Sequence, residues 1–217
     1  MKVLVIGANG KTGKRVVRNL VASRHEPVAM IRSVEQKTTF DELGAATVLG
    51  DLEYPIDHAV RGCDAVIFAA GSGGKTGKDK TVLIDHIGAI RSMVTAAVQG
   101  ASRYIMLSSI NKDPKSTSKI MHYHRAKAHA DDFLHGMHEI MPDHPKLEWT
   151  IVCPGGLTEE AETGTVSVGT DPHVSGQTSR ENLAATLVAC LDEPATIRKD
   201  FTLLDGETPI AEALKGV

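Results

Sequence analysis

The stretch VLVIGANGKTG, residues 3–13, joins a short apolar run to three glycines in the spacing G-x-x-G-x-x-G. The run Val3–Ile6 predicts a buried strand, and the stretch Gly13–Ala22 predicts a helix with its apolar side chains on one face. A glycine-rich turn that leaves a strand and opens a helix is typical of nucleotide-binding βαβ units. This stretch therefore predicts both the start of an α/β fold and an anion-binding loop.

Each glycine of the loop has a separate expected role. Gly7 permits the tight turn after the strand, Gly10 lets the backbone approach a diphosphate closely, and Gly13 lets the helix pack on the strand. Free backbone N–H groups and the positive end of the helix dipole then bind the anion. We therefore expect the diphosphate of a dinucleotide to be bound by Gly7, Asn9, Gly10, Lys11, Thr12 and Gly13.

Short apolar runs alternate with helical patterns along the rest of the chain. Strands are predicted at residues 27–31, 46–49, 65–70, 104–107 and 149–152. The alternation predicts an α/β fold, a Rossmann-type doubly wound parallel sheet with helices on both faces. At 217 residues, without a repeat or a linker, the chain suits a single domain spanning residues 1–217.

The residues after Pro154 differ in character from the alternating part. Glycines and β-branched residues near 164–168 predict short strands, and Thr178 with Glu181 resembles a capping box that opens a further helix. We expect residues 155–217 to form a small C-terminal region that roofs the substrate pocket.

Composition limits the kinds of partner. The formal net charge is -3, so no overall field favours nucleic acid or an anionic membrane. The three cysteines lie far apart, the ten histidines show no zinc-type spacing, and the N-terminus carries no targeting pattern. We expect a cytoplasmic protein, a monomer or homodimer, that binds a small-molecule substrate and no metal, nucleic acid or membrane.

Arg32 and Ser33 follow the second predicted strand, about 20 residues past the glycine loop. NAD-binding proteins usually place an acidic side chain at this strand end, whereas NADP-binding proteins place an arginine near the 2′-phosphate. A guanidinium can bind this phosphate through two hydrogen bonds or stack on the adenine. We therefore predict NADP as the cofactor, with NAD the weaker candidate.

Further motifs stand at the ends of the third, fourth and sixth predicted strands: Gly50-Asp51-Leu52, Ala69-Ala70-Gly71 and Cys153-Pro154-Gly155. In this order, and together with the glycine loop, they resemble the atypical short-chain dehydrogenase/reductase family, in its small NAD(P)-binding, NAD-dependent epimerase/dehydratase-like form. The resemblance covers essentially the whole chain. It implies an adenine contact for Asp51 and Leu52, with Gly50 in the same cofactor-binding set. It further implies a ribose contact for Ala69, Ala70 and Gly71, and a place beside the nicotinamide for Pro154 and Gly155.

Tyr123 and Lys127 form a Y-x-x-x-K pair, whose spacing places both side chains on one face of a helix. A free phenol is a poor proton donor or acceptor near neutral pH, and a neighbouring ammonium stabilises its phenolate form. The resemblance implies that Lys127 also holds the nicotinamide ribose, and that Ser109 orients the substrate carbonyl. Ser109, Tyr123 and Lys127 are therefore the expected catalytic residues. The family's larger sugar-nucleotide enzymes often carry Asn where Asp85 stands here.

Together these features predict an NADP(H)-dependent oxidoreductase of the atypical short-chain dehydrogenase/reductase type that acts on a small carbonyl-like substrate. Two alternatives stay open: a nucleotide-sugar epimerase or dehydratase, and an NAD(P)-binding redox sensor or regulatory protein without catalysis. The short segment after Pro154 counts against the epimerase, because a large polar substrate needs more enclosing surface. The Tyr123–Lys127 pair counts against the sensor.

Overall fold

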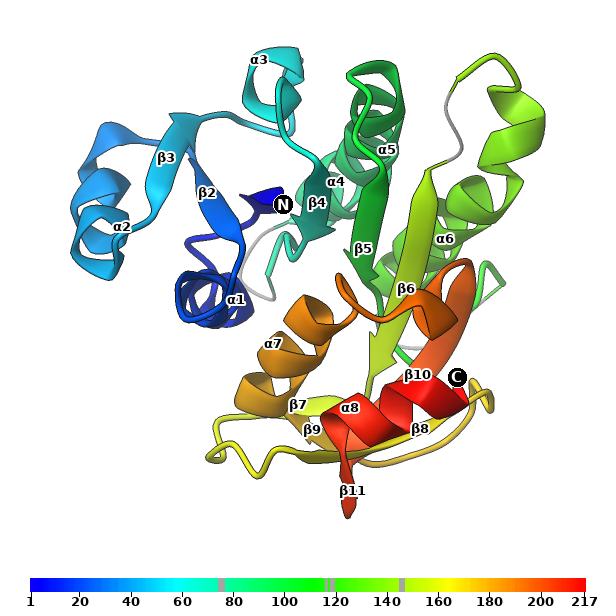
Figure 1. Ribbon diagram of the computed structural model, residues 1–217. Coiled ribbons are helices and arrows are strands. Elements are labelled where there is room, and N and C mark those ends of the chain that lie inside the picture. Colours follow the sequence, from blue (N-terminus) through cyan, green and yellow to red (C-terminus); the bar gives the residue numbers. More distant parts are fainter. Residues whose placement is uncertain (74–76, 116, 118–119, 145–146) are drawn as a thin grey trace.

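A nine-stranded sheet runs through the molecule and carries helices on both faces (Figure 1). The structure is a computed structural model that describes residues 1–73, 77–115, 117, 120–144 and 147–217. The strands lie in the order β11-β8-β10-β6-β5-β4-β1-β2-β3. Their bounds are β1 (Lys2–Ile6), β2 (Glu26–Ile31), β3 (Ala46–Leu49), β4 (Ala65–Phe68), β5 (Arg103–Leu107), β6 (Glu148–Pro154), β8 (Thr165–Gly169), β10 (Lys199–Asp205) and β11 (Thr208–Pro209).

The strand pairing confirms the predicted doubly wound parallel sheet. Every pair from β3 across to β10 is parallel, whereas β8 and β11 extend the β10 edge in antiparallel fashion. A separate two-stranded sheet joins β7 (Gly156–Thr158) to β9 (Gln177–Ser179). The winding reverses between β1 and β4, and ligands of such sheets bind at the carboxyl ends of the strands near this reversal.

Two helical layers cover the sheet, and each encloses its own apolar cluster. The layer over one face contains α1 (Lys11–Val21), α2 (Lys37–Leu43), α7 (Arg180–Ala189) and the short α8 (Ile210–Ala213). The layer over the other contains α3 (Asp57–Val60), the π-helix η2 (Thr81–Gly88) between α4 (Lys78–Lys80) and α5 (Ala89–Val98), and α6 (Met121–Ile140). Both faces of the parallel strands are therefore buried, which explains why these strands read as continuous apolar runs.

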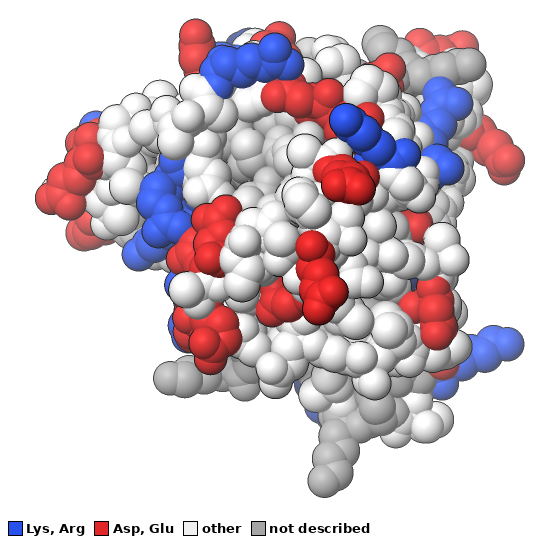
Figure 2. Space-filling view, turned by 60° about the horizontal axis from the view of Figure 1, so that its bottom comes forward, with Lys and Arg blue, Asp and Glu red and all other residues white. Residues whose placement is uncertain are grey.

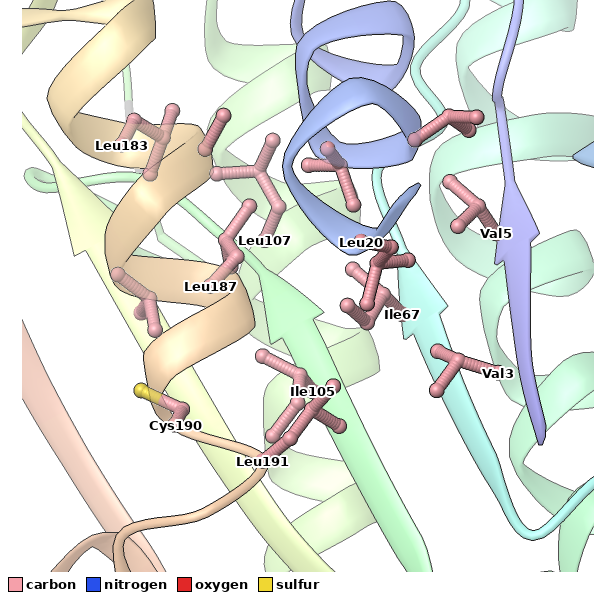
Figure 3. Packing of buried hydrophobic residues seen from close by; sticks show 14 of the residues in the cluster. Val3, Val5, Leu20, Ile67, Ile105, Leu107, Leu183, Leu187, Cys190 and Leu191 are labelled. Atoms are coloured by element: carbon pink, nitrogen blue, oxygen red, sulfur yellow. The ribbon is translucent and has the colours of Figure 1, made fainter. Parts of the chain in front are cut away.

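Helices α1 and α7 pack side by side on the sheet (Figures 1 and 3). Leu20 of α1 and Leu187 of α7 point into one cluster with Ile67 and Ile105 of the central strands (Figure 3). All four side chains are fully buried. This packing holds the beginning of α7 close to the beginning of α1, and both helix starts reach the pocket described below.

The helical stretch Lys78–Val98 is the one span among the described residues that is long and apolar enough to cross a membrane. Its most apolar window is 56% buried inside the protein. Ala89, Met93, Ala96 and Ala97 belong to the apolar cluster that this layer forms with the sheet. Packing against the sheet therefore accounts for its apolar composition.

Two local predictions were wrong. The fourth strand ends at Phe68 and not at residue 70, so Ala69 and Ala70 lie in the loop beyond it. Helix α7 is capped by Ser179, whose hydroxyl accepts a hydrogen bond from the Asn182 N–H at 3.0 Å, and not by Thr178. Thr178 belongs to β9, and its hydroxyl donates to the Leu203 carbonyl at 2.6 Å, so it is not available as a cap.

Candidate functional site

A cavity of about 700 Å³ opens at the carboxyl edge of the parallel strands. Figure 2 shows the molecule from this side, with a hollow whose rim carries both basic and acidic side chains. All of the predicted site residues line this cavity except Gly13 and Ser33. The structure therefore brings together residues from six strand ends that are far apart in the sequence.

The glycine loop has the geometry that a closely bound diphosphate requires. Gly7 has a φ of 81°, and a Cβ atom there would lie 2.6 Å from the Ala70 backbone. Gly13 packs beneath the loop and does not line the cavity, so that a Cβ atom there would lie 2.2 Å from the Gly7 carbonyl oxygen. Gly10 and the first residues of α1 do line it, and the first turn of α1 holds no acidic side chain. These features fit a dinucleotide, whose diphosphate would lie at the helix start.

Arg32 lines the cavity beyond the end of β2. Its backbone N–H donates to Gln36 Oε1 at 2.9 Å, and its guanidinium makes no ion pair with any described carboxylate. Ser33 is not among the residues that line the cavity. Its side chain forms a hydrogen bond with Glu35, and this bond lowers the pKa of the Glu35 carboxyl. The arginine is thus available to an anionic ligand.

Tyr123 and Lys127 lie on the same face of α6, and both line the cavity. Lys127 is buried, with Nζ 3.1 Å from the Leu107 carbonyl oxygen, 3.6 Å from Asp85 Oδ1 and 5.9 Å from the centre of the Tyr123 ring. Burial opposes the charge of Lys127, but the neighbouring oxygens of Tyr123 and Asp85 outweigh burial and raise the pKa of the ammonium. Lys127 is therefore a cation beside the phenol of Tyr123.

The two serines after β5 make different contacts. The Ser109 hydroxyl donates to the Ile110 carbonyl at 3.0 Å on the cavity wall. The Ser108 hydroxyl is buried and donates to Asp131 Oδ2 at 2.5 Å. Both serines line the cavity, but Ser108 is buried and bound to Asp131, whereas Ser109 is partly exposed, so its proposed contact with a substrate oxygen stays a prediction.

A buried ionic cluster lies behind this wall. The Lys112 ammonium contacts Asp131 Oδ2 at 2.7 Å, Asp200 Oδ2 at 2.8 Å and the Cys153 sulfur at 3.1 Å. Burial raises the pKa of the Asp131 carboxyl, although Lys112 opposes the shift, and burial also raises the pKa of the Cys153 thiol. The cluster joins the loop after β5 to α6 and β10, and so fixes the Ser109 loop relative to the helix of Tyr123.

Sequence analysis missed several residues of the cavity wall, including Met30, Gln36, Leu157 and Arg180. Arg180 had a recognisable signal, because a basic residue in the first turn of a helix opposes the helix dipole. Helix stability therefore does not account for an arginine at this position, and a role in ligand binding is one that could have been considered. Among the described residues, no group of three or more His, Cys, Asp or Glu side chains is arranged to hold a metal ion.

Comparison with known proteins agrees with this geometry. Residues 7–194 match the model of the NAD(P)H-binding family. The chain is 42% identical over 221 residues to the "Uncharacterized sugar epimerase YhfK" of Bacillus subtilis, and the alignment covers 99% of each protein.

Two solved structures extend the comparison to the fold. The "Putative NAD-dependent epimerase/dehydratase" from Bacillus halodurans has a TM-score of 0.92 and 41% identity over 100% of both chains. The oxidoreductase ylbE from Lactococcus lactis has a TM-score of 0.85 and 28% identity, over 100% of this chain and 96% of that one. The resemblance to small epimerase/dehydratase-like proteins is thus confirmed. With its glycine loop, strand-end pocket and match over most of its length, the chain belongs to the NAD(P)H-binding family.

Proposed function

We propose that this protein is an NADP(H)-dependent oxidoreductase that reduces a small carbonyl substrate. The observation that carries the proposal is the position of Tyr123 and the buried Lys127 ammonium on the wall of the cavity that contains the glycine loop. Ser109 lies on the same wall, at the end of β5. A proton donor, a cation and a hydroxyl thus converge where a nicotinamide and a carbonyl would meet.

Tyr123, Ser109 and Lys127 have different roles in the proposed reaction. A bound reduced nicotinamide supplies the hydride for the carbonyl carbon. Tyr123 gives its hydroxyl proton to the carbonyl oxygen, so that one hydride and one proton convert the carbonyl to an alcohol. Ser109 holds this oxygen by a hydrogen bond, and Lys127 stabilises the phenolate that Tyr123 becomes.

Arg32 supports NADP over NAD as the cofactor. It lies on the cavity wall at the end of β2, where the adenine ribose of a Rossmann-bound dinucleotide lies. A guanidinium that no described carboxylate pairs with suits a 2′-phosphate, to which it can donate two parallel hydrogen bonds.

The size of the cavity supports a small substrate. Ligand pockets measure roughly 300–1,000 Å³, and a dinucleotide alone would fill much of the 700 Å³ available here. The second candidate is a nucleotide-sugar epimerase or dehydratase, which the names of the B. subtilis and B. halodurans relatives favour. Such a substrate would need additional space that the described residues do not enclose.

The three cysteines are all buried and free. Buried thiols that form no disulfide suit a reducing compartment, so we propose the cytoplasm as the place of action.

One experiment separates these functions. NADPH oxidation is followed by absorbance with a panel of small aldehydes, ketones and quinones, and Tyr123→Phe serves as the matched control. The oxidoreductase predicts turnover that depends on Tyr123. Conversion of a nucleotide sugar without net cofactor consumption would instead identify an epimerase. Tight cofactor binding with no turnover on any substrate would leave the redox sensor.

A further inference from the structure

The carboxylate of Glu159 contacts three cations, two of which line the cavity. Its Oε1 accepts hydrogen bonds from Lys11 Nζ at 2.8 Å and from Arg180 Nη1 at 2.9 Å. Its Oε2 accepts from Arg15 Nη2 at 3.0 Å. The hydrogen bond from Lys11 is the main cause of the lowered pKa of Glu159, so this carboxylate is charged at neutral pH.

Two of the three cations belong to the cavity wall. Lys11 is the first residue of α1, directly after Gly10, and Arg180 is the first residue of α7. Both line the cavity, and because they share one oxygen of Glu159, the Arg180 guanidinium lies close to the start of α1. The Arg180 side chain is only 19% exposed and also donates to the Thr158 carbonyl at 3.2 Å, so it is held in this position.

A diphosphate bound at the start of α1 would meet the same cations. The free N–H groups and the dipole of a helix start bind the phosphates of a dinucleotide. Lys11 stands at this helix start, the Arg180 guanidinium binds the same oxygen as Lys11, and their present partner is a carboxylate with one negative charge. A diphosphate carries more charge and more acceptor oxygens, so it would compete with Glu159 for both side chains.

We infer that Glu159 is an internal anion that the cofactor diphosphate displaces, and that Arg180 is a further cofactor-binding residue. The inference rests on the proposed NADP(H) cofactor. Glu159 neutralises Lys11 and Arg180 in the free protein and opposes the incoming diphosphate by charge repulsion. It therefore lowers cofactor affinity, and makes release of the spent cofactor easier.

A purely structural role for Glu159 predicts the opposite change in cofactor affinity. If its ion pairs only tie the segment after β7 to α1, their removal loosens this part of the cavity wall and weakens cofactor binding. Charge-neutral substitution of Glu159 therefore distinguishes the two roles by the direction of the change in affinity.

The test is titration of the whole protein with NADPH, followed by cofactor fluorescence. Glu159→Gln should tighten NADPH binding roughly three- to tenfold. The matched control is Glu181→Gln, because Glu181 pairs with Arg15 and Arg18 on the same two helices but does not line the cavity. This control should leave the affinity unchanged. In the Glu159→Gln background, Arg180→Met should weaken NADPH binding at least tenfold.

Two smaller probes assign the effect to the diphosphate. ADP contains the diphosphate, so Glu159→Gln should tighten ADP binding as well. 2′-AMP lacks it and should bind equally to both forms. Weaker or unchanged NADPH binding in Glu159→Gln would overturn the inference, as would an equal gain for 2′-AMP. These titrations need no substrate, so failure of the proposed carbonyl reduction would be seen separately, as bound cofactor without turnover.

Discussion

The Lys127 ammonium and the Asp85 carboxylate face each other inside the protein, with Nζ 3.6 Å from Oδ1 and both side chains buried. Asp85 Oδ2 also accepts a hydrogen bond from the Ser72 N–H at 2.9 Å. One carboxylate thus joins the loop after β4, the π-helix η2 and the helix of Tyr123. Together with Tyr123, Asp85 raises the pKa of the Lys127 ammonium against the effect of burial.

Arg32→Ala should change cofactor preference and not cofactor binding in general. Loss of a charged, bidentate contact costs about 1.5–3 kcal/mol, so NADPH affinity should fall roughly ten- to a hundredfold. NADH lacks the 2′-phosphate, and its affinity should stay nearly unchanged. Calorimetric titration of both cofactors measures this difference, and equal affinities in the unaltered protein would remove the case for NADP.

The second and third glycines of the loop, Gly10 and Gly13, should respond differently to substitution. A Cβ atom on Gly10 would lie 3.2 Å from the Gly7 oxygen, which a small shift can relieve, so Gly10→Val should fold. Its side chain would occupy the space of the diphosphate, and cofactor binding should be lost. Gly13→Ala, at 2.2 Å from the same oxygen, should destabilise the fold by about 1–3 kcal/mol. Thermal unfolding and cofactor titration separate the two effects, and normal NADPH affinity in Gly10→Val would show that the loop does not bind the diphosphate.

Sequence reasoning located the parts of the site that depend on local pattern. The glycine loop and the strand ends at Asp51, Ala70 and Gly155 follow from short motifs between apolar runs, and the structure brings them to one cavity. The Glu159 contacts could not be found this way, because Lys11 and Glu159 are 148 residues apart and meet only after α7 packs on α1.

The wrong prediction of the residue that caps α7 has a similar origin. The sequence offers two adjacent hydroxyls, Thr178 and Ser179, as possible caps of α7, and local pattern does not choose between them. Pairing of β9 with β7, together with the bond from Thr178 to the Leu203 carbonyl, assigns the cap to Ser179. The choice is therefore made by tertiary contacts.

Lys112→Met should destabilise the protein strongly, because it leaves the Asp131 carboxylate buried without its cation. Breaking one half of a buried pair costs about 3–5 kcal/mol. Burial raises the pKa of Asp131, and the variant lacks the Lys112 charge that opposes this shift, so Asp131 takes up a proton more readily there and the loss should shrink as the pH falls. Urea unfolding measures the loss. The double variant Lys112→Met/Asp131→Asn should regain most of the stability, and no regain would argue against the ion pair as its source.

The ion pairs of Asp192 should stabilise the protein at neutral pH and lose this effect in acid, and Asp192→Asn tests this. Asp192 contacts Arg24 at 2.6 Å and the buried His25 ring at 3.2 Å. Burial opposes its charge, but these partners outweigh burial and lower the pKa of the carboxyl. Its contribution is therefore complete above the ordinary value of about 4 and disappears as the pH falls through the lower folded value.

At pH 7 the variant should be less stable by about 1 kcal/mol or less, since Asp192 is partly exposed. Unfolding curves of the two proteins should converge once the pH has fallen through the lowered folded pKa of Asp192. A difference that grows on acidification would contradict the assignment of this ion pair.

The most direct test of the central claim is the rate of NADPH oxidation by Tyr123→Phe beside the unaltered protein, on the substrate that the panel identifies. Removal of the hydroxyl leaves the ring in place, so stability and NADPH affinity should hold, whereas Lys127→Ala should weaken NADPH binding. Turnover of Tyr123→Phe should fall by the ~10²–10⁴ that a positioned general acid contributes. Near-normal turnover in this variant would contradict the claim that Tyr123 donates the proton.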